Sequence, residues 1–436
     1  MLAKIAIPIS LILHSVFFNA SAQNQVPVIS NVSFTNNAQN HSLTINYDVD
    51  DAENDKLKIA LEVTNHAGHH VSSILRDLKG DVGFPVMKGT KKSISFIYPD
   101  SIKNIETFTV SLIADDLYKV KIEDLVAQVD TMRLKSYMNT IYGNRYYKDK
   151  AGARHKEEVK DLLHNNFSSY NLKANRHDFT YNDDKGQNII GERTGSQLQP
   201  KVYILCGHFD TTKKSPGADD NGSGVAGILE AARILSQYNY KNTIRFIGFD
   251  LEEMGLIGSK NYVFNGGLGA DEKVDGVINY DMIGFYSTKP KSQLIPKGYD
   301  IIFPAEVAAI AKNDYKGDFV VNTGNKNSKL LQDAFTSSAS KYVTDLKVVP
   351  LVTAYNGEMT PDLMASDHFV FWRKDIKALH IGDGGETRNV FLDTPKDTIE
   401  KLNFTFISNI VKTTIATLAE LAEINHSSTS TTHIKL

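Results

Sequence analysis

Hydrophobic and polar residues alternate along the first third of the chain, from about residue 26 to residue 129. The alternation is clearest at positions 43–49, 57–63, 94–96 and 108–112. A strand with one buried face shows this period of two, and runs separated by Asp, Asn and Gly indicate antiparallel strands joined by turns. We therefore predict a small antiparallel β-sandwich over residues 23–130.

Beyond Asp130 the apolar residues recur at helical spacing, which predicts helices at 132–141, 159–167 and 225–235. Apolar runs of a different kind, rich in consecutive hydrophobic residues, lie at 202–206, 244–249, 277–280 and 376–381. Such runs are typical of strands buried on both faces. We predict an α/β domain over residues 131–425, with a mostly parallel central sheet flanked by helices. The polar tail 426–436 is expected to be frayed.

The composition and net charge of the chain indicate which kinds of binding partner to expect. A chain of 436 residues suits two domains. With 48 Lys and Arg against 51 Asp and Glu, the formal charge of -3 offers no global basic field, so we expect no nucleic-acid partner. The single cysteine, Cys206, cannot form an internal disulfide, and its apolar neighbours indicate a packing residue rather than a catalytic thiol.

Residues 1–22 have the features of a secretory leader. Lys4 provides a positive start, the segment from 5 to about 18 is apolar, and Ala20-Ser21-Ala22 supplies small residues for cleavage. This pattern predicts a signal peptide cleaved after Ala22 and a secreted or periplasmic mature protein. The apolar run is shorter than the roughly 20 residues of a transmembrane helix, and we expect no membrane span in the mature chain.

One turn of the predicted sandwich, Asp50–Asp55, is dense in oxygen ligands that could hold a calcium ion. A solvated acidic turn is the simpler interpretation. The nearby His66, His69 and His70 could bind metal, but their Asn and Gly neighbours favour an exposed loop.

Polar side chains follow the predicted strands of the second domain, where ligands of open α/β sheets bind. The positions in question are His208 and Asp210, Asp219 and Asp220, Glu252 and Glu253, Asp281, and His368 just before the fourth strand. Mixed nitrogen and oxygen ligands suit zinc, and more than four candidates suit two ions. Each motif alone would more often be a surface feature, but their common placement at strand ends favours a metal site.

The segments HFD, SPGADDNGSG, DLEEMGLIGS, NYDMIG and SDH resemble, in order and approximate spacing, those of the co-catalytic di-zinc aminopeptidases, whose relatives include glutaminyl cyclases. The resemblance covers about residues 131 to 425. The sandwich lies outside it and is similar, by pattern, to immunoglobulin- or fibronectin-like modules of secreted bacterial enzymes.

The resemblance implies two Zn²⁺ ions per chain. His208 and Asp281 would be terminal ligands of one ion, and Asp220 would bridge both ions. Glu253 and His368 would be terminal ligands of the other ion.

Two further carboxylates would assist the reaction. Glu252 would be the general base, and a turn after its strand would be needed to aim two adjacent glutamates at the site. Asp210 would accept a hydrogen bond from the His208 nitrogen that does not touch metal. The implied substrates are peptides with a free amino terminus, from which one residue is hydrolysed.

Two alternatives stay open. Glutaminyl cyclisation on the same scaffold would need a single zinc ion and no hydrolytic water. A non-catalytic surface-binding protein built from the sandwich and a degenerate enzyme domain would be expected to lack a ligand.

Overall fold

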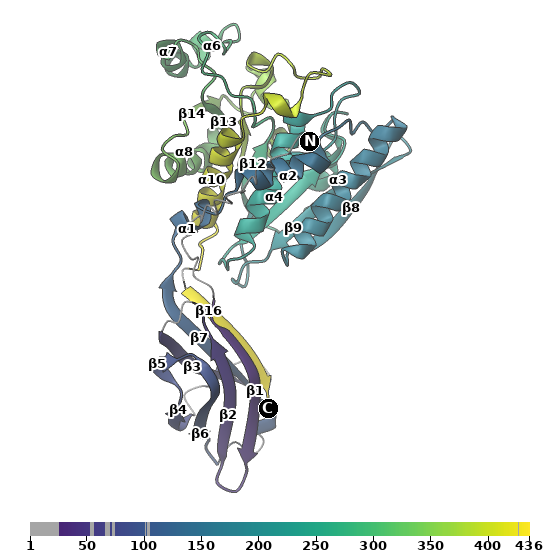
Figure 1. Ribbon diagram of the computed structural model, residues 1–436. Helices are drawn as coiled ribbons and strands as arrows, with labels where there is room; N and C mark the ends of the chain where they lie inside the picture. The colour runs from purple at the N-terminus through teal and green to yellow at the C-terminus, as the bar shows by residue number, and fades with distance from the viewer. Residues whose placement is uncertain are drawn as a thin grey trace, which may run out of the picture. The chain divides into compact units, whose positions relative to one another are not determined.

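The computed structural model describes residues 26–52, 56–65, 70–71, 75–100, 102, 105–425 and 427–436 (Figure 1). The predicted leader and two histidines of the sandwich loop, His66 and His69, lie outside the described residues. The described residues divide into two compact units, one formed by those up to Val120 together with those after Asn425, and one formed by Lys121–Asn425. We call them the β-sandwich unit and the α/β unit.

The β-sandwich unit consists of two antiparallel sheets of four strands each, in the orders β1-β2-β6-β4 and β16-β7-β3-β5. Its strands are β1 (Val28–Asn37), β2 (Ser42–Asp50), β3 (Lys56–Thr64), β4 (Arg76–Gly80), β5 (Gly83–Met87), β6 (Gly89–Ile97), β7 (Thr109–Lys119) and β16 (Ser427–Lys435). The predicted antiparallel β architecture is therefore confirmed.

Alternation of side chains explains why these segments form a sandwich. Every second residue of β2 points inward, so that Leu43, Ile45, Tyr47 and Val49 are buried in the core that both sheets share. Burying side chains of this size contributes roughly 1.5–3 kcal/mol each, which favours one register over a shift that would turn them outward.

The C-terminal segment is not frayed, and that prediction is wrong. Residues Ser427–Lys435 form β16, which pairs antiparallel with β7. Ile434 is buried in the sandwich core, and Nδ1 of His433 lies 2.8 Å from the hydroxyl of Ser111. Backbone hydrogen bonds to β7 hold this segment in place, and such bonds do not depend on side-chain type. A segment with little apolar patterning can therefore still form a strand.

The acidic turn after β2 gives no support to a calcium site. Nζ of Lys88 donates to the backbone oxygen of Asp51 at 2.8 Å and lies 3.8 Å from a carboxylate oxygen of Asp50. The ammonium group of Lys88 therefore lies beside the oxygens of Asp50 and Asp51 where a cation would bind. Residues 53–55 lie outside the described residues.

The α/β unit is built on a mixed sheet of eight strands in the order β14-β13-β15-β12-β10-β11-β9-β8. The strands are β8 (Lys173–Tyr181), β9 (Asp184–Arg193), β10 (Val202–His208), β11 (Thr243–Phe249), β12 (Val274–Tyr280), β13 (Val320–Asn325), β14 (Val348–Thr353) and β15 (Ala378–Gly382). The four central strands β15, β12, β10 and β11 are parallel and correspond to the four predicted runs, so the fold class is confirmed.

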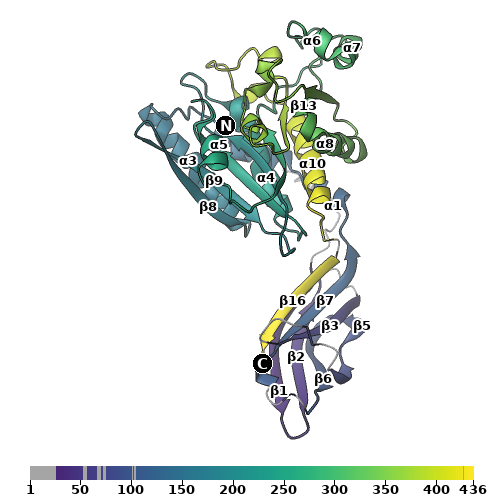
Figure 2. The same cartoon turned by 180° about the vertical axis from the view of Figure 1, so that it is seen from behind.

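Helices cover both faces of this sheet. They are α1 (Ile122–Val126), α2 (Thr131–Ile141), α3 (Lys150–Ser169), α4 (Gly224–Leu235), α5 (Ile257–Phe264), α6 (Tyr299–Ile302), α7 (Pro304–Lys312), α8 (Lys329–Tyr342), α9 (His368–Trp372) and α10 (Phe404–Leu421). The face seen in Figure 1 carries α3 and α4, and the face seen in Figure 2 carries α5. No helix among the described residues is long and apolar enough to span a membrane.

Side-chain caps fix where the predicted helices begin. Asp130 accepts the N–H of Met132 at the start of α2, and Asp149 accepts those of Ala151 and Gly152 at the start of α3. Helix α4 begins beyond the turn that follows β10. Because β10, β11 and β12 are parallel, their carboxyl ends meet at one edge of the sheet, and the candidate site lies there.

Candidate metal centre

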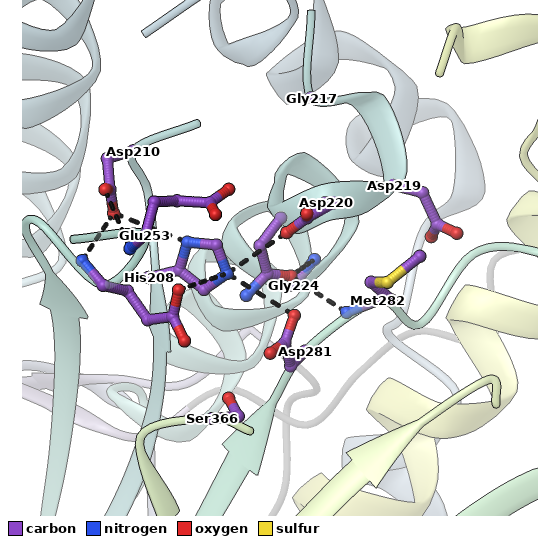
Figure 3. A network of polar contacts seen from close by, with 12 residues as sticks. His208, Asp210, Gly217, Asp219, Asp220, Gly224, Glu253, Asp281, Met282 and Ser366 are labelled. Carbon is purple, nitrogen blue, oxygen red and sulfur yellow. Dashed lines mark hydrogen bonds and ion pairs between the residues drawn. The ribbon is translucent and has the colours of Figure 1, made fainter. Parts of the chain in front are cut away.

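His208 is the residue around which the predicted site residues gather. It is the last residue of β10 and is 1% exposed. Its Nε2 lies 3.2 Å from an oxygen of Asp220, 3.4 Å from one of Asp281 and 4.0 Å from one of Glu252. Figure 3 shows Asp220 and Asp281 reaching the imidazole from separate segments. Burial alone would lower the pKa of His208, but these carboxylates and Asp210 raise it well above its usual value.

Two groups of side chains offer ligand atoms that lie within 4.8 Å of one another. One group is His208, Glu252 and Asp281, and the other is His208, Asp220 and Glu253. An imidazole nitrogen with several carboxylate oxygens is a donor set that zinc accepts. Because His208 belongs to both groups, the structure provides two adjoining places where a cation could be held.

The tandem glutamates are carried on a turn rather than on extended backbone. Leu251, directly before them, has a φ of 55°, which lies in the left-handed region that non-glycine residues rarely adopt. The backbone N–H groups of Glu252 and Glu253 donate to the two oxygens of Asp210 at 3.0 and 3.2 Å. The same carboxylate lies 3.5 Å from Nδ1 of His208. Asp210 therefore contacts both the imidazole and the turn that aims the glutamates.

Asp250, at the start of this turn, is fixed by ion pairs to helix α3. Its carboxylate is fully buried and lies 2.8 Å from Nζ of Lys156 and 3.1 Å from Nζ of Lys160, both on α3. Gly258 passes so close that a Cβ there would lie 2.3 Å from the backbone oxygen of Asp250. Only glycine permits this approach without a shift of the backbone.

Asp220 belongs to a kinked helical turn, η3 (Ala218–Ser223), that is joined to two other segments. Asp397 accepts the backbone N–H of Asp220 at 3.2 Å. The amide of Asn221 donates to the backbone oxygen of Tyr280 at 2.8 Å, at the end of β12. Since Asp281 follows Tyr280, this bond holds the segments of Asp220 and Asp281 beside each other.

Asp219 points away from the imidazole (Figure 3). Its two oxygens accept the backbone N–H of Gly284 at 2.8 Å and the side-chain amide of Asn389 at 2.7 Å. Asp219 therefore braces the loop and does not join the ligand groups.

Arg145 lies fully buried next to the loop that carries Asp220. Its guanidinium donates to five backbone carbonyls, those of Ile141, Gly143, Phe209, Pro216 and Gly217. Gly217 has a φ of 61°, and a Cβ there would lie 2.5 Å from Nη2 of Arg145. Burial lowers the pKa of Arg145 to about 10, although the charges of Asp220 and Asp210 oppose the shift.

The carboxylates of Glu253 and Asp220 lie close together in a buried site, and their mutual repulsion favours binding of a cation. Burial first, and the charge of Asp220 next, raise the pKa of Glu253 to about 10. Burial raises the pKa of Asp220 to about 6 against the opposing effect of His208. Oε1 of Glu253 is buried and has no hydrogen-bond partner among the described residues. A divalent cation would neutralise this repulsion and satisfy that oxygen, so the residues fit a metal ion.

His368, which the sequence analysis expected as a ligand, lies outside both ligand groups, and its buried Nδ1 has no hydrogen-bond partner among the described residues. Its Nε2 lies 2.9 Å from the backbone oxygen of Leu363, and its ring packs edge-on against Trp372 and stacks on His380. Burial and the neighbouring His380 lower its pKa to about 3. His368 is the first residue of α9, and the charge of Asp281 acts on its ring.

Asp393 is a residue that sequence reasoning missed. It lies exposed on the loop between β15 and α10, with a φ of 58°. It is close enough for its charge to raise the pKa of both Asp220 and Glu253, which belong to the same ligand group. The segment FLDTPKDT has no strand before it and has the composition of an ordinary turn, so nothing in its pattern marked Asp393 as a site residue.

An open, mostly parallel sheet with a buried histidine and carboxylates at its carboxyl edge defines an α/β protein with a hydrolase-like metal centre. Residues 188–418 match the model of Peptidase family M28, and the chain belongs to this family.

Individual relatives agree with this assignment. The chain is 30% identical over 232 residues to the uncharacterized protein YfbL of Escherichia coli, a match that covers 50% of this chain and 66% of that protein. It is 35% identical over 130 residues to the aminopeptidase YwaD of Bacillus subtilis, covering 30% of this chain and 27% of that protein. In both cases the match spans less than two thirds of the relative.

A solved structure shows a similar fold. LapB from Legionella pneumophila superposes with a TM-score of 0.53 at 21% identity, covering 69% of this chain and 75% of that one.

Proposed function

We propose that the protein is a zinc-dependent aminopeptidase that hydrolyses the first peptide bond of peptides with a free amino terminus. The observation that carries the proposal is the pair of ligand groups that share His208, with Glu252 in one and Glu253 in the other. Membership of Peptidase family M28 and similarity to the aminopeptidase YwaD support the reaction class.

We infer two zinc positions. His208 and Asp281 would hold one ion, Glu253 and Asp393 the other, and Asp220 would bridge them. Asp393 takes the place in this scheme that His368 had in the sequence analysis, because its charge acts on both Asp220 and Glu253, whereas the ligand-group carboxylate that acts on His368 is Asp281. When bound, zinc supplies a Lewis acid that polarises the scissile carbonyl and lowers the pKa of water toward about 7.

The chain's own residues would then move the proton. Glu252 would accept a proton from the attacking water and pass it to the leaving amine, a step that needs a carboxylate beside the reacting atoms. Asp210 would hold the His208 imidazole in one orientation and keep the turn of the glutamates fixed through the two N–H groups it accepts.

The role of Glu252 can be separated from that of a ligand. Glu252→Gln should keep the metal content of the wild type and lower kcat by about 10²–10⁴-fold, the range for loss of a general base. Glu253→Gln should lose metal as well as activity. Glu158→Gln, at an exposed position on α3, is the matched control and should change neither. Loss of metal from Glu252→Gln would make Glu252 a ligand and refute its role as base.

The reaction itself is tested with purified, metal-analysed protein and a panel of aminoacyl chromogenic substrates. Substrates with a free amino group should be hydrolysed, their N-acetylated counterparts should not, and a zinc chelator should abolish turnover. No hydrolysis by fully metallated protein would reject the proposal. Formation of pyroglutamate from a peptide beginning with glutamine, without hydrolysis, would point instead to cyclisation.

The proposal includes export of the protein. The leader-like residues 1–22 motivate it. Amino-terminal sequencing of the mature protein should give Gln23 as the first residue, and a retained Met1 in exported protein would contradict cleavage after Ala22.

A further inference from the structure

A cavity of about 320 Å³ adjoins the metal centre on the side of Asp281. Asp281 and Met282 line one end of it, and its walls include Phe303, Val307 and Leu351. The walls come from α6, α7, β13 and β14, which the sequence analysis did not predict. The cavity has the volume and apolar lining typical of a small-ligand pocket.

Three carboxylates also line this apolar cavity, namely those of Glu306, Asp362 and Glu386, whereas no lysine or arginine lines it. Within the described residues, none of the three forms an ion pair with a lysine or an arginine. The hydroxyl of Tyr299 donates to Asp362 at 3.4 Å. The cavity is therefore negative and has no cation of its own.

Tyr299 joins the apolar wall of the cavity to its carboxylates. Burial raises the pKa of its phenol, and the charges of Asp362 and Glu386 raise it further. Tyr299 itself is 9% exposed and packs with Phe303 and Leu351 in one apolar cluster. The apolar cluster is thus joined to Asp362 through the hydroxyl of Tyr299, and Glu386 lines the same cavity.

We propose that this cavity receives the side chain of the substrate's first residue and selects a long side chain that ends in a cation, lysine or arginine. The inference rests on the proposed aminopeptidase function. The methylene groups of such a side chain would pack against Phe303 and Val307, because long charged side chains bury their stems along apolar surface. The ammonium or guanidinium group would reach Asp362 and Glu386.

A neutral pocket of the same size would instead select leucine or phenylalanine. Glutamate and aspartate at the first position are disfavoured, since the cavity already holds unpaired negative charge. Because Asp362 and Glu386 are exposed, their interaction with a cation is screened by salt, and the preference for arginine over leucine should fall as ionic strength rises.

The kinetic test compares kcat/KM for arginyl, lysyl, leucyl and glutamyl chromogenic substrates. Wild type should prefer the arginyl and lysyl substrates. Asp362→Asn combined with Glu386→Gln should lower kcat/KM for these two by about tenfold and leave the leucyl value unchanged, as expected for loss of two screened charges. Glu358→Gln, an exposed residue on the same connection that does not line the cavity, is the control. A wild type that prefers leucine, or a ratio unmoved by the double substitution, would overturn the inference.

A binding measurement keeps this inference separate from the proposed function. Calorimetry with the Glu252→Gln protein compares argininamide with norleucinamide, which differ in the charge at the end of the chain. Argininamide should bind more tightly, and the difference should disappear in the Asp362→Asn, Glu386→Gln background. Selective binding without hydrolysis of any substrate by the wild type would refute the aminopeptidase alone. Hydrolysis without selectivity for the cation would refute the cavity assignment alone.

Discussion

Asp250 offers a stringent test of how the α/β unit holds the turn that carries Glu252 and Glu253. Its carboxylate is fully buried and meets two lysines, Lys156 and Lys160, whose side chains are 4% and 3% exposed. It also accepts the backbone N–H of Gln187 at 3.0 Å. Asp250→Asn keeps the shape of the side chain but removes the negative charge that both ammonium groups share.

The expected loss of stability is large. Removing one partner of a buried ion pair leaves an uncompensated charge in the interior and typically costs about 3–5 kcal/mol. Lys160 keeps a second partner in Glu157 at 2.8 Å, so Lys156 bears most of the loss. A deficit of this size is a large fraction of the roughly 5–15 kcal/mol that stabilises an ordinary domain.

The single tryptophan makes the measurement specific to one unit. Trp372 is fully buried in the α/β unit and donates its indole N–H to the backbone oxygen of Ala378 at 2.9 Å. Its fluorescence during urea unfolding therefore reports on the unit that contains Asp250. The free energy of unfolding is compared between wild type and Asp250→Asn.

The matched control carries the same substitution in an exposed ion pair. Asp161 lies 2.6 Å from Nη2 of Arg176, with side chains 62% and 31% exposed, so Asp161→Asn should cost at most about 1 kcal/mol. A double-mutant cycle of Asp250→Asn with Lys156→Met should show strong coupling, because removing the lysine removes the unpaired charge. If Asp250→Asn costs no more than Asp161→Asn, the buried-charge reasoning is refuted.

Three further predictions follow from the same structure. Ending the chain at Asn425 removes β16, so proteolysis of the sandwich should accelerate while the Trp372 unfolding midpoint stays unchanged; an unchanged proteolysis rate would contradict the pairing of β16 with β7. Burial raises the pKa of the Cys206 thiol well above its usual value, so a thiol reagent should label it only in urea, and rapid labelling of native protein would show otherwise. Burial opposes ionisation of Asp275, but Lys377 and Lys201 lower its pKa to about 2. Its stabilising effect is present above the unfolded value of roughly 3.9 and is lost as pH falls toward 2, so Asp275→Asn should flatten the dependence of the urea midpoint between pH 5 and pH 2.

The parts of the sheet that could be predicted are those whose burial is complete on both faces. All seven residues of β10 and of β11 are buried, and most of them are apolar, which is the pattern that marked both strands, although β11 also buries Arg245 in ion pairs with Glu192 and Glu272. Strand β13 is also buried, yet it contains Asn322 and Thr323. The amide of Asn322 donates to the backbone oxygen of Gln332 on α8, which returns a hydrogen bond at 2.7 Å. Gln332 therefore satisfies the amide nitrogen and the backbone oxygen of Asn322 through a tertiary contact, which the hydrophobic pattern could not reveal.

The residues of the candidate site could likewise be predicted only where the sheet alone sets their position. His208, Glu252 and Asp281 could be proposed from the sequence because each lies just beyond a predicted parallel strand, where direction and edge are set by the sheet. His368 precedes a strand and begins a helix, so its side-chain direction depends on packing that no local pattern contains. Asp393 lies on a loop whose path is fixed only by tertiary contacts, and it was missed for that reason.

Arg145 shows why such a dense group of carboxylates can fold and still accept metal. A buried cation is needed to offset the charges of Asp220, Asp210 and Glu253, and Arg145 acts on all three. An arginine that bound their oxygens directly would compete with a metal ion for the same lone pairs. Arg145 instead directs its donors to backbone carbonyls and makes no hydrogen bond to those oxygens among the described contacts. It thus supplies positive charge to the centre and shapes the loop of Asp220 without occupying a ligand position.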